Sequence, residues 1–109
     1  MSGRLEVWLF AAQRLSAMIL APLVLLHLAT MIYAVQDGLS AAEILDRTRG
    51  SVFWGGFYAL FIAAASVHGA IGLRAVLREW TPLRGAGVVA MAFCVAILAL
   101  GWRAVAAIT

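Results

Sequence analysis

The sequence has very little charge. Of its 109 residues only 12% are charged, while 65% are hydrophobic. A soluble domain of this length needs a largely polar surface, and this composition cannot supply one. The chain is long enough for a single domain, residues 1–109, and it contains no internal repeat. These absences favour a membrane protein, with membrane lipid as one of its partners, over a water-soluble protein.

The sequence also has only one cysteine and no lysine. Cys94 is the single cysteine, which excludes a disulfide framework and a cysteine-based metal or iron–sulfur site within the chain. All eight basic residues are arginine, and the formal net charge is +3. The arginines stand at the ends of apolar runs and do not cluster, so nucleic acid is not an expected partner.

Long uncharged runs are what the sequence does contain. Three stretches have no formal charge: residues 15–36, 50–73 and 85–102. Because a bilayer-spanning helix needs about 20 apolar residues, each run can cross a membrane once. The expected transmembrane helices cover about 11–35, 51–77 and 84–106, and residues 1–10 are expected to form a short amphipathic entry.

The first loop has a helix signal of its own. Ser40 is followed three residues later by Glu43, which is the spacing of a capping box. This spacing predicts a short helix over 41–48 that lies at the membrane surface. The predicted fold is therefore all-α, an integral membrane three-helix bundle with one short interfacial helix in the first loop.

The arginines also predict an orientation. Five fall on the side of the N-terminus and second loop, and three on the other side, which favours a cytoplasmic N-terminus. The first apolar run exceeds the roughly 7–15 residues of a signal-peptide core, so we interpret it as an anchor. No long Arg/Ser-rich presequence precedes it, which favours a bacterial inner membrane over an organelle.

The second apolar run places a histidine among small residues. Ala64, Ala65, His68 and Gly72 share one face of the expected helix. Small residues let helices pack closely, and the histidine could simply hydrogen-bond a neighbouring helix. Alternatively, the flat face could admit a planar macrocycle, with the neutral imidazole as an axial ligand of haem iron. The spacing alone leaves both interpretations open.

Two arginines follow His68 toward the expected cytoplasmic end. Arg74 and Arg78 could pair with haem propionates, which need cationic partners when they are partly desolvated. Their alternative role is to extend to the membrane surface as ordinary cytoplasmic-side cations.

A second histidine, His27, lies in the first apolar run. Counted from the cytoplasmic ends of their helices at 1.5 Å per residue, His27 lies roughly 24 Å deep and His68 roughly 14 Å deep. One haem needs both ligands at nearly the same level, so each histidine is expected to find its partner on another chain. His27 is a possible second haem ligand or a packed histidine bonded to a carbonyl group or water.

The start of the first helix carries further polar residues. Gln13, Arg14 and Ser16 lie where this helix is expected to meet the cytoplasmic interface. A charged donor beside a hydroxyl could hold a quinone carbonyl. The alternative is an interface anchor next to a serine that a helix tolerates.

Two motifs in this order resemble a known family. The stretch QRLSAMILAPL is followed by H-x3-GL-x2-VL-x-acidic-aromatic, which runs from His68 to Trp80. Together with three expected helices, they resemble the small membrane-anchor subunits of succinate dehydrogenase (succinate:quinone oxidoreductase), of the three-helix cytochrome b type. The resemblance implies that His68 is an axial ligand of haem b, whose second ligand comes from a partner membrane-anchor subunit.

The resemblance also implies a quinone site. Arg14 and Ser16 align with family residues near the quinone pocket, and Glu79 and Trp80 stand where the family has Asp-Tyr. Trp80 departs from that pattern because an indole N–H donates a hydrogen bond but cannot accept one. His27 is a second departure, and it is similar to the first-helix histidine of the two-haem branch.

The function implied is that of a subunit outside the catalytic core of an oxidoreductase complex. It would dock the iron–sulfur and flavoprotein subunits, share haem b and help frame the site where electrons from succinate reach quinone. An anchor of a fumarate reductase or of another quinone-linked oxidoreductase is the nearest alternative. A non-catalytic three-helix assembly protein without haem is the alternative of another class.

Overall fold

Four helices make up the chain. The structure, a computed structural model, describes residues 3–82 and 84–109. The helices are α1 (Gly3–Gln36), α2 (Ala41–Thr48), α3 (Val52–Trp80) and α4 (Ala86–Ile108). By length and composition, α1, α3 and α4 can each cross a membrane. The predicted all-α fold, with three apolar helices of membrane length and a short helix in the first loop, is confirmed.

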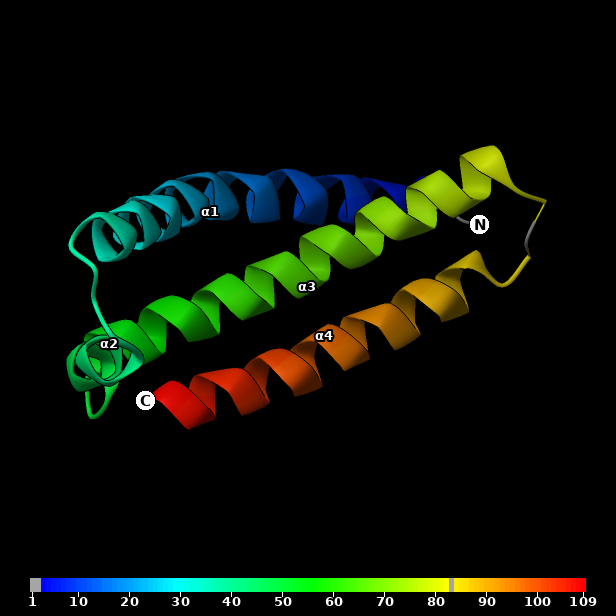
Figure 1. Cartoon of the computed structure of the whole chain (residues 1–109). Helices are drawn as coiled ribbons and strands as arrows, with labels where there is room; N and C mark the ends of the chain where they lie inside the picture. Colours follow the sequence, from blue (N-terminus) through cyan, green and yellow to red (C-terminus); the bar gives the residue numbers. More distant parts are fainter. Residues whose placement is uncertain (1–2, 83) are drawn as a thin grey trace.

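The three long helices lie side by side, with α3 between α1 and α4 (Figure 1). The bundle measures 49 × 24 × 23 Å. At one end lie the start of α1, the end of α3 and the connection to α4, and we call this the N-terminal end. At the other end lie α2 and the C-terminus, and we call this the α2 end.

α1 is longer than the helix expected from the uncharged run. It begins at Gly3, because residues 3–10 contain no proline and continue the helix without a break. Pro22 lies inside α1, where its missing N–H is tolerated in a membrane helix. The expected separate entry segment is therefore the first part of α1, apart from residues 1 and 2, which lie outside the described residues.

The capping box of α2 forms as its sequence predicts. The backbone N–H of Glu43 donates to Ser40 Oγ at 3.2 Å, and the backbone N–H of Ser40 donates to Glu43 Oε1 at 3.2 Å. Thr48 Oγ1 then donates to the carbonyl of Ile108 at 2.6 Å, which ties α2 to the end of α4.

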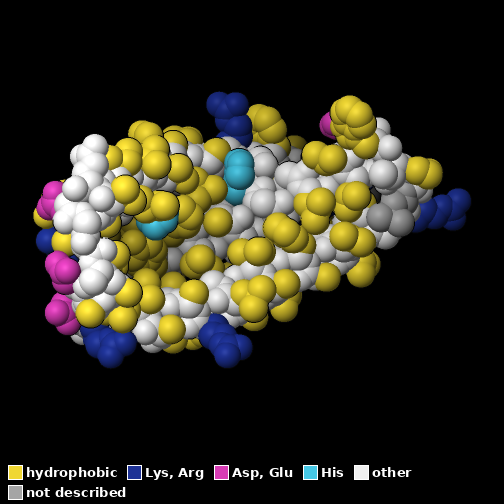
Figure 2. All heavy atoms as spheres, viewed as in Figure 1, with side chains coloured by type: hydrophobic (Ala, Val, Ile, Leu, Met, Phe, Trp, Pro, Cys, Tyr) yellow, Lys and Arg dark blue, Asp and Glu magenta, His cyan; other side chains and the backbone are white. Residues whose placement is uncertain are grey.

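Small residues fill the contact surfaces between the long helices. The buried residues of α3 and α4 are mostly alanine, serine or glycine: Ala64, Ser66, Ala70, Ala86, Ala90 and Gly101. Small side chains let helix backbones approach closely, which is the usual packing mode in lipid. Large apolar side chains instead cover the outside of the bundle, and acidic side chains lie at its two ends (Figure 2).

Candidate functional site

His68 lies on α3 where that helix faces α1. Its Nδ1 atom is 3.3 Å from Ser16 Oγ. Ser16 is 5% exposed, and its hydroxyl also donates to the carbonyl of Gln13 at 3.0 Å. The imidazole itself is only partly buried. The structure therefore joins a residue predicted for haem and a residue predicted for quinone in one contact between α1 and α3.

The small-residue face around His68 is partly covered by α1. Ala64 is 6% exposed, and a Cβ atom added to Gly72 would lie 3.6 Å from Gln13 Nε2. Gln13 Oε1 is buried and has no hydrogen-bond partner among the described residues. Such an orphaned acceptor is costly in a protein interior, so a donor from outside the chain would be favoured at this position.

The residues around His68 fit the predicted haem as a source of one axial ligand. With Nδ1 engaged by Ser16, Nε2 has no hydrogen-bond partner in residues 3–82 and 84–109. A neutral imidazole with one free nitrogen is a common axial ligand of haem iron. The described residues contain no group of three metal-ligating side chains, so a metal here would depend on a macrocycle and on a ligand from elsewhere.

Glu6 forms ion pairs with both arginines that follow His68 along α3. Arg74 Nη2 donates to Glu6 Oε1 at 3.0 Å, and Arg78 Nη1 donates to the same oxygen at 2.9 Å. The side chain of Arg74 is 11% exposed, whereas Arg78 and Glu6 are about half exposed. Arg74 is therefore a largely buried cation whose guanidinium holds a carboxylate, which is the chemistry expected of a propionate partner.

Sequence reasoning did not assign Glu6 to the site. The sequence did contain a signal for this pairing, because Glu6 is the only acidic residue before Asp37. The end of α3, which carries the two arginines, returns to the end of the bundle where α1 begins. Glu6, Arg74, Arg78 and Glu79 line an open hollow of about 500 Å³ at the N-terminal end. Of the residues predicted for quinone, only Glu79 belongs to this hollow.

The other residues predicted for quinone are not brought together within this chain. Arg14 lies over the ring of Phe10, with Cζ 5.7 Å from the ring centroid. Ser16 is only two positions further along α1, so the two side chains leave the helix in different directions. Trp80 ends α3 and is 81% exposed.

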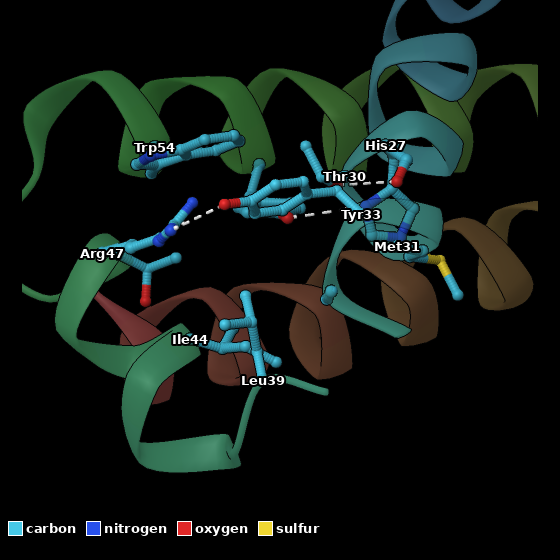
Figure 3. Close-up of a pocket in the computed structure, with 11 residues that line it drawn as sticks. His27, Thr30, Met31, Tyr33, Leu39, Ile44, Arg47 and Trp54 are labelled. Carbon is cyan, nitrogen blue, oxygen red and sulfur yellow. Dashed lines mark hydrogen bonds between the residues drawn. The ribbon is translucent and has the colours of Figure 1, made fainter. Parts of the chain in front are cut away.

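His27 occupies a separate pocket near the α2 end. Its Nδ1 atom is 3.5 Å from the hydroxyl of Tyr58. The rings of Tyr58 and Phe61 approach the imidazole edge-on, with centroids 5.6 and 5.5 Å away. The pocket has a volume of about 200 Å³, and α1, α2 and α3 contribute its walls (Figure 3).

An arginine and a tyrosine lie at the mouth of this pocket. Arg47 Nη2 donates to the hydroxyl of Tyr33 at 3.3 Å, and its guanidinium lies 5.1 Å from the centroid of the Tyr33 ring (Figure 3). The contact with the Tyr33 hydroxyl raises the pKa of Arg47. Arg47 therefore remains a cation on α2, outside the long helices.

The two histidines stand at different heights in the bundle. His68 contacts Ser16 of α1, and His27 lies eleven residues further along α1, which is roughly 16 Å. Figure 2 agrees, since imidazole atoms reach the surface of the bundle at two separate places. The two side chains of one chain therefore do not form a pair on opposite faces of one haem.

Comparison with known protein families gives a match over nearly the whole chain. Residues 1–106 match the family described as succinate dehydrogenase/fumarate reductase transmembrane subunit. No curated protein and no solved structure matches the chain.

Proposed function

The chain belongs to the succinate dehydrogenase/fumarate reductase transmembrane subunit family, and from that premise we propose that it anchors such a complex and shares a haem b with a partner anchor subunit. The family makes it a multi-pass membrane protein that works with other subunits. The observation that carries the haem proposal is the His68 imidazole, with Nδ1 on Ser16 and Nε2 free.

In this proposal His68 Nε2 would hold the haem iron together with a ligand from the partner anchor. A bound haem b supplies a one-electron carrier within the membrane. Arg74 lies six residues beyond His68, roughly 9 Å along α3, and its guanidinium already donates a hydrogen bond to the carboxylate of Glu6. We assign Arg74 and Arg78 as partners of the haem propionates.

The N-terminal end of the bundle is the proposed docking face for the iron–sulfur and flavoprotein subunits, and we place it on the cytoplasmic side of a bacterial inner membrane. Arg74, Arg78 and Arg84 give this end its positive charge. A basic face at the end of three apolar helices suits a soluble partner that approaches from the water phase.

The proposed quinone site lies at the same end, with partner chains completing it. Arg14 and the indole N–H of Trp80 are donors, and a quinone carbonyl is an acceptor. Glu79 adds an exposed carboxylate at this end. Under this proposal the complex transfers electrons from succinate to quinone, and a fumarate reductase would use the same parts in the opposite direction.

A reduced-minus-oxidised spectrum of the purified complex tests the haem assignment. We expect a haem b band in the wild type and its loss in His68→Ala, because the iron then lacks one axial ligand. Ser66→Ala is the matched control, since Ser66 is fully buried on the same helix and bonds only the carbonyl of Ala63. If the wild-type complex contains no haem, the haem proposal is wrong while the anchor role still stands. That result would favour a three-helix assembly protein without haem.

A further inference from the structure

Ser16 is the side chain of α1 that touches the His68 imidazole. The two residues are 52 positions apart in sequence, and their contact of 3.3 Å bridges α1 and α3. Ser16 is 5% exposed, so water has little access to its hydroxyl. The contact is therefore a tertiary hydrogen bond whose partners are fixed by the packing of the two helices.

The direction of this hydrogen bond follows from the other bond that Ser16 makes. A serine hydroxyl has one proton and two lone pairs. Its proton is donated to the carbonyl of Gln13 at 3.0 Å. Toward His68 the oxygen can then only accept, so Nδ1 must carry the proton. A neutral imidazole has one N–H, which leaves Nε2 with a lone pair.

We propose that Ser16 is a positioning residue that holds His68 in the Nδ1-protonated form, with Nε2 presented as the haem ligand. The inference rests on the proposed function, in which His68 binds haem iron. A hydrogen bond to the outer nitrogen of a ligating histidine fixes its tautomer and ring orientation and makes the inner nitrogen a stronger donor.

This role replaces the one that the sequence suggested for Ser16. A hydroxyl that donates to Gln13 and accepts from His68, in a buried contact between two helices, has little left to offer a quinone oxygen. The pair also explains why a polar side chain is buried there, since a buried hydroxyl needs hydrogen-bond partners and both are supplied.

The test compares haem binding and haem potential in the purified complex. In Ser16→Ala we expect apparent haem affinity to fall roughly 10- to 100-fold, the usual cost of losing such a partner. We also expect the haem midpoint potential to become more positive, because a less basic imidazole stabilises the oxidised iron less. A residue that only filled space would change stability without this signed shift in potential.

Two further variants and one control sharpen the test. Ser16→Thr keeps the hydroxyl and should retain both affinity and potential. Ser16→Cys keeps the shape but offers a weak acceptor, so it should shift the potential in the same direction even if Ser16→Ala fails to assemble. Ser66 lies two positions before His68 on α3, so its side chain leaves the helix in a different direction. Ser66→Ala should therefore leave the haem midpoint potential unchanged.

The outcomes separate the inference from the proposed function. If His68→Ala loses haem while Ser16→Ala and Ser16→Cys keep wild-type affinity and potential, Ser16 has no positioning role and the haem assignment stands. If His68→Ala retains haem, or the wild-type complex has none, the ligand assignment falls and the role of Ser16 falls with it.

Discussion

At the residue scale, the two histidines differ in what surrounds them. His68 contacts a single buried hydroxyl and keeps one nitrogen free. His27 is held by the hydroxyl of Tyr58 and by two aromatic edges. Edge-to-face rings and one hydrogen bond account for a packed imidazole without any metal. We therefore propose that His68 ligates the haem and that His27 stabilises the α1–α3 contact.

Replacing His27 by alanine tests this division of roles. We expect His27→Ala to leave the haem b spectrum of the complex unchanged, because His27 lies at another level from His68. Losing its hydrogen bond and ring contacts should lower the stability of the complex by about 1 kcal/mol, measurable as a lower Tm. The loss of one haem band with another retained would instead identify His27 as a ligand of a second haem.

At the element scale, local signals predict the helices and say less about their contacts. The uncharged runs predicted three membrane-length helices, and the spacing of Ser40 and Glu43 predicted α2, because both signals lie within single segments. The contact of Ser16 with His68 was not predicted. It depends on how far each helix is rotated about its axis, and residues on another helix decide that rotation.

The ion pairs of Glu6 show the same limit. The sequence of α3 alone predicted Arg74 and Arg78 as possible haem propionate partners, but the carboxylate that both contact lies on α1. Glu6 lies on α1 only because this helix begins at Gly3, earlier than the uncharged run suggested. The helix boundary and the ion pairs were therefore missed together.

Gly101 tests how closely α3 and α4 must pack. A Cβ atom at this position would contact Cγ2 of Ile62 and lie 2.7 Å from its Cδ1. Overpacking typically costs about 1–3 kcal/mol, and the roughly 1 kcal/mol that alanine gains over glycine in a helix offsets part of it. We therefore expect Gly101→Ala to destabilise the complex by up to about 2 kcal/mol. The change should appear as a lower Tm of the detergent-solubilised complex.

Gly87→Ala is the matched control on the same helix. A Cβ atom there meets nothing within 4 Å, so its Tm should stay at or slightly above that of the wild type. Equal Tm values for the Gly101 and Gly87 variants would contradict the close packing of α3 against α4.

At the scale of the whole molecule, the bundle is an apolar rod with charge concentrated toward its ends. Large apolar side chains cover its sides, and only 11–17% of the most apolar window of each long helix is buried inside the bundle. In water this surface would drive aggregation, whereas in lipid it is the natural exterior. The apolar sides suit contact with lipid or with other membrane helices, and the charged ends suit contact with water.

The orientation of this rod is testable because the chain has one cysteine. In a Cys94→Ser background, Ser40→Cys introduces a thiol at the α2 end and Thr81→Cys one at the N-terminal end, both at exposed positions. With the N-terminus in the cytoplasm, a membrane-impermeant maleimide should label Ser40→Cys in spheroplasts and label Thr81→Cys only after permeabilisation. The physical reason is the excess of arginine at the N-terminal end, which is retained on the cytoplasmic side during insertion. The reversed labelling pattern would invert the topology and move the arginine pair, the proposed docking face and the proposed quinone site to the other side of the membrane.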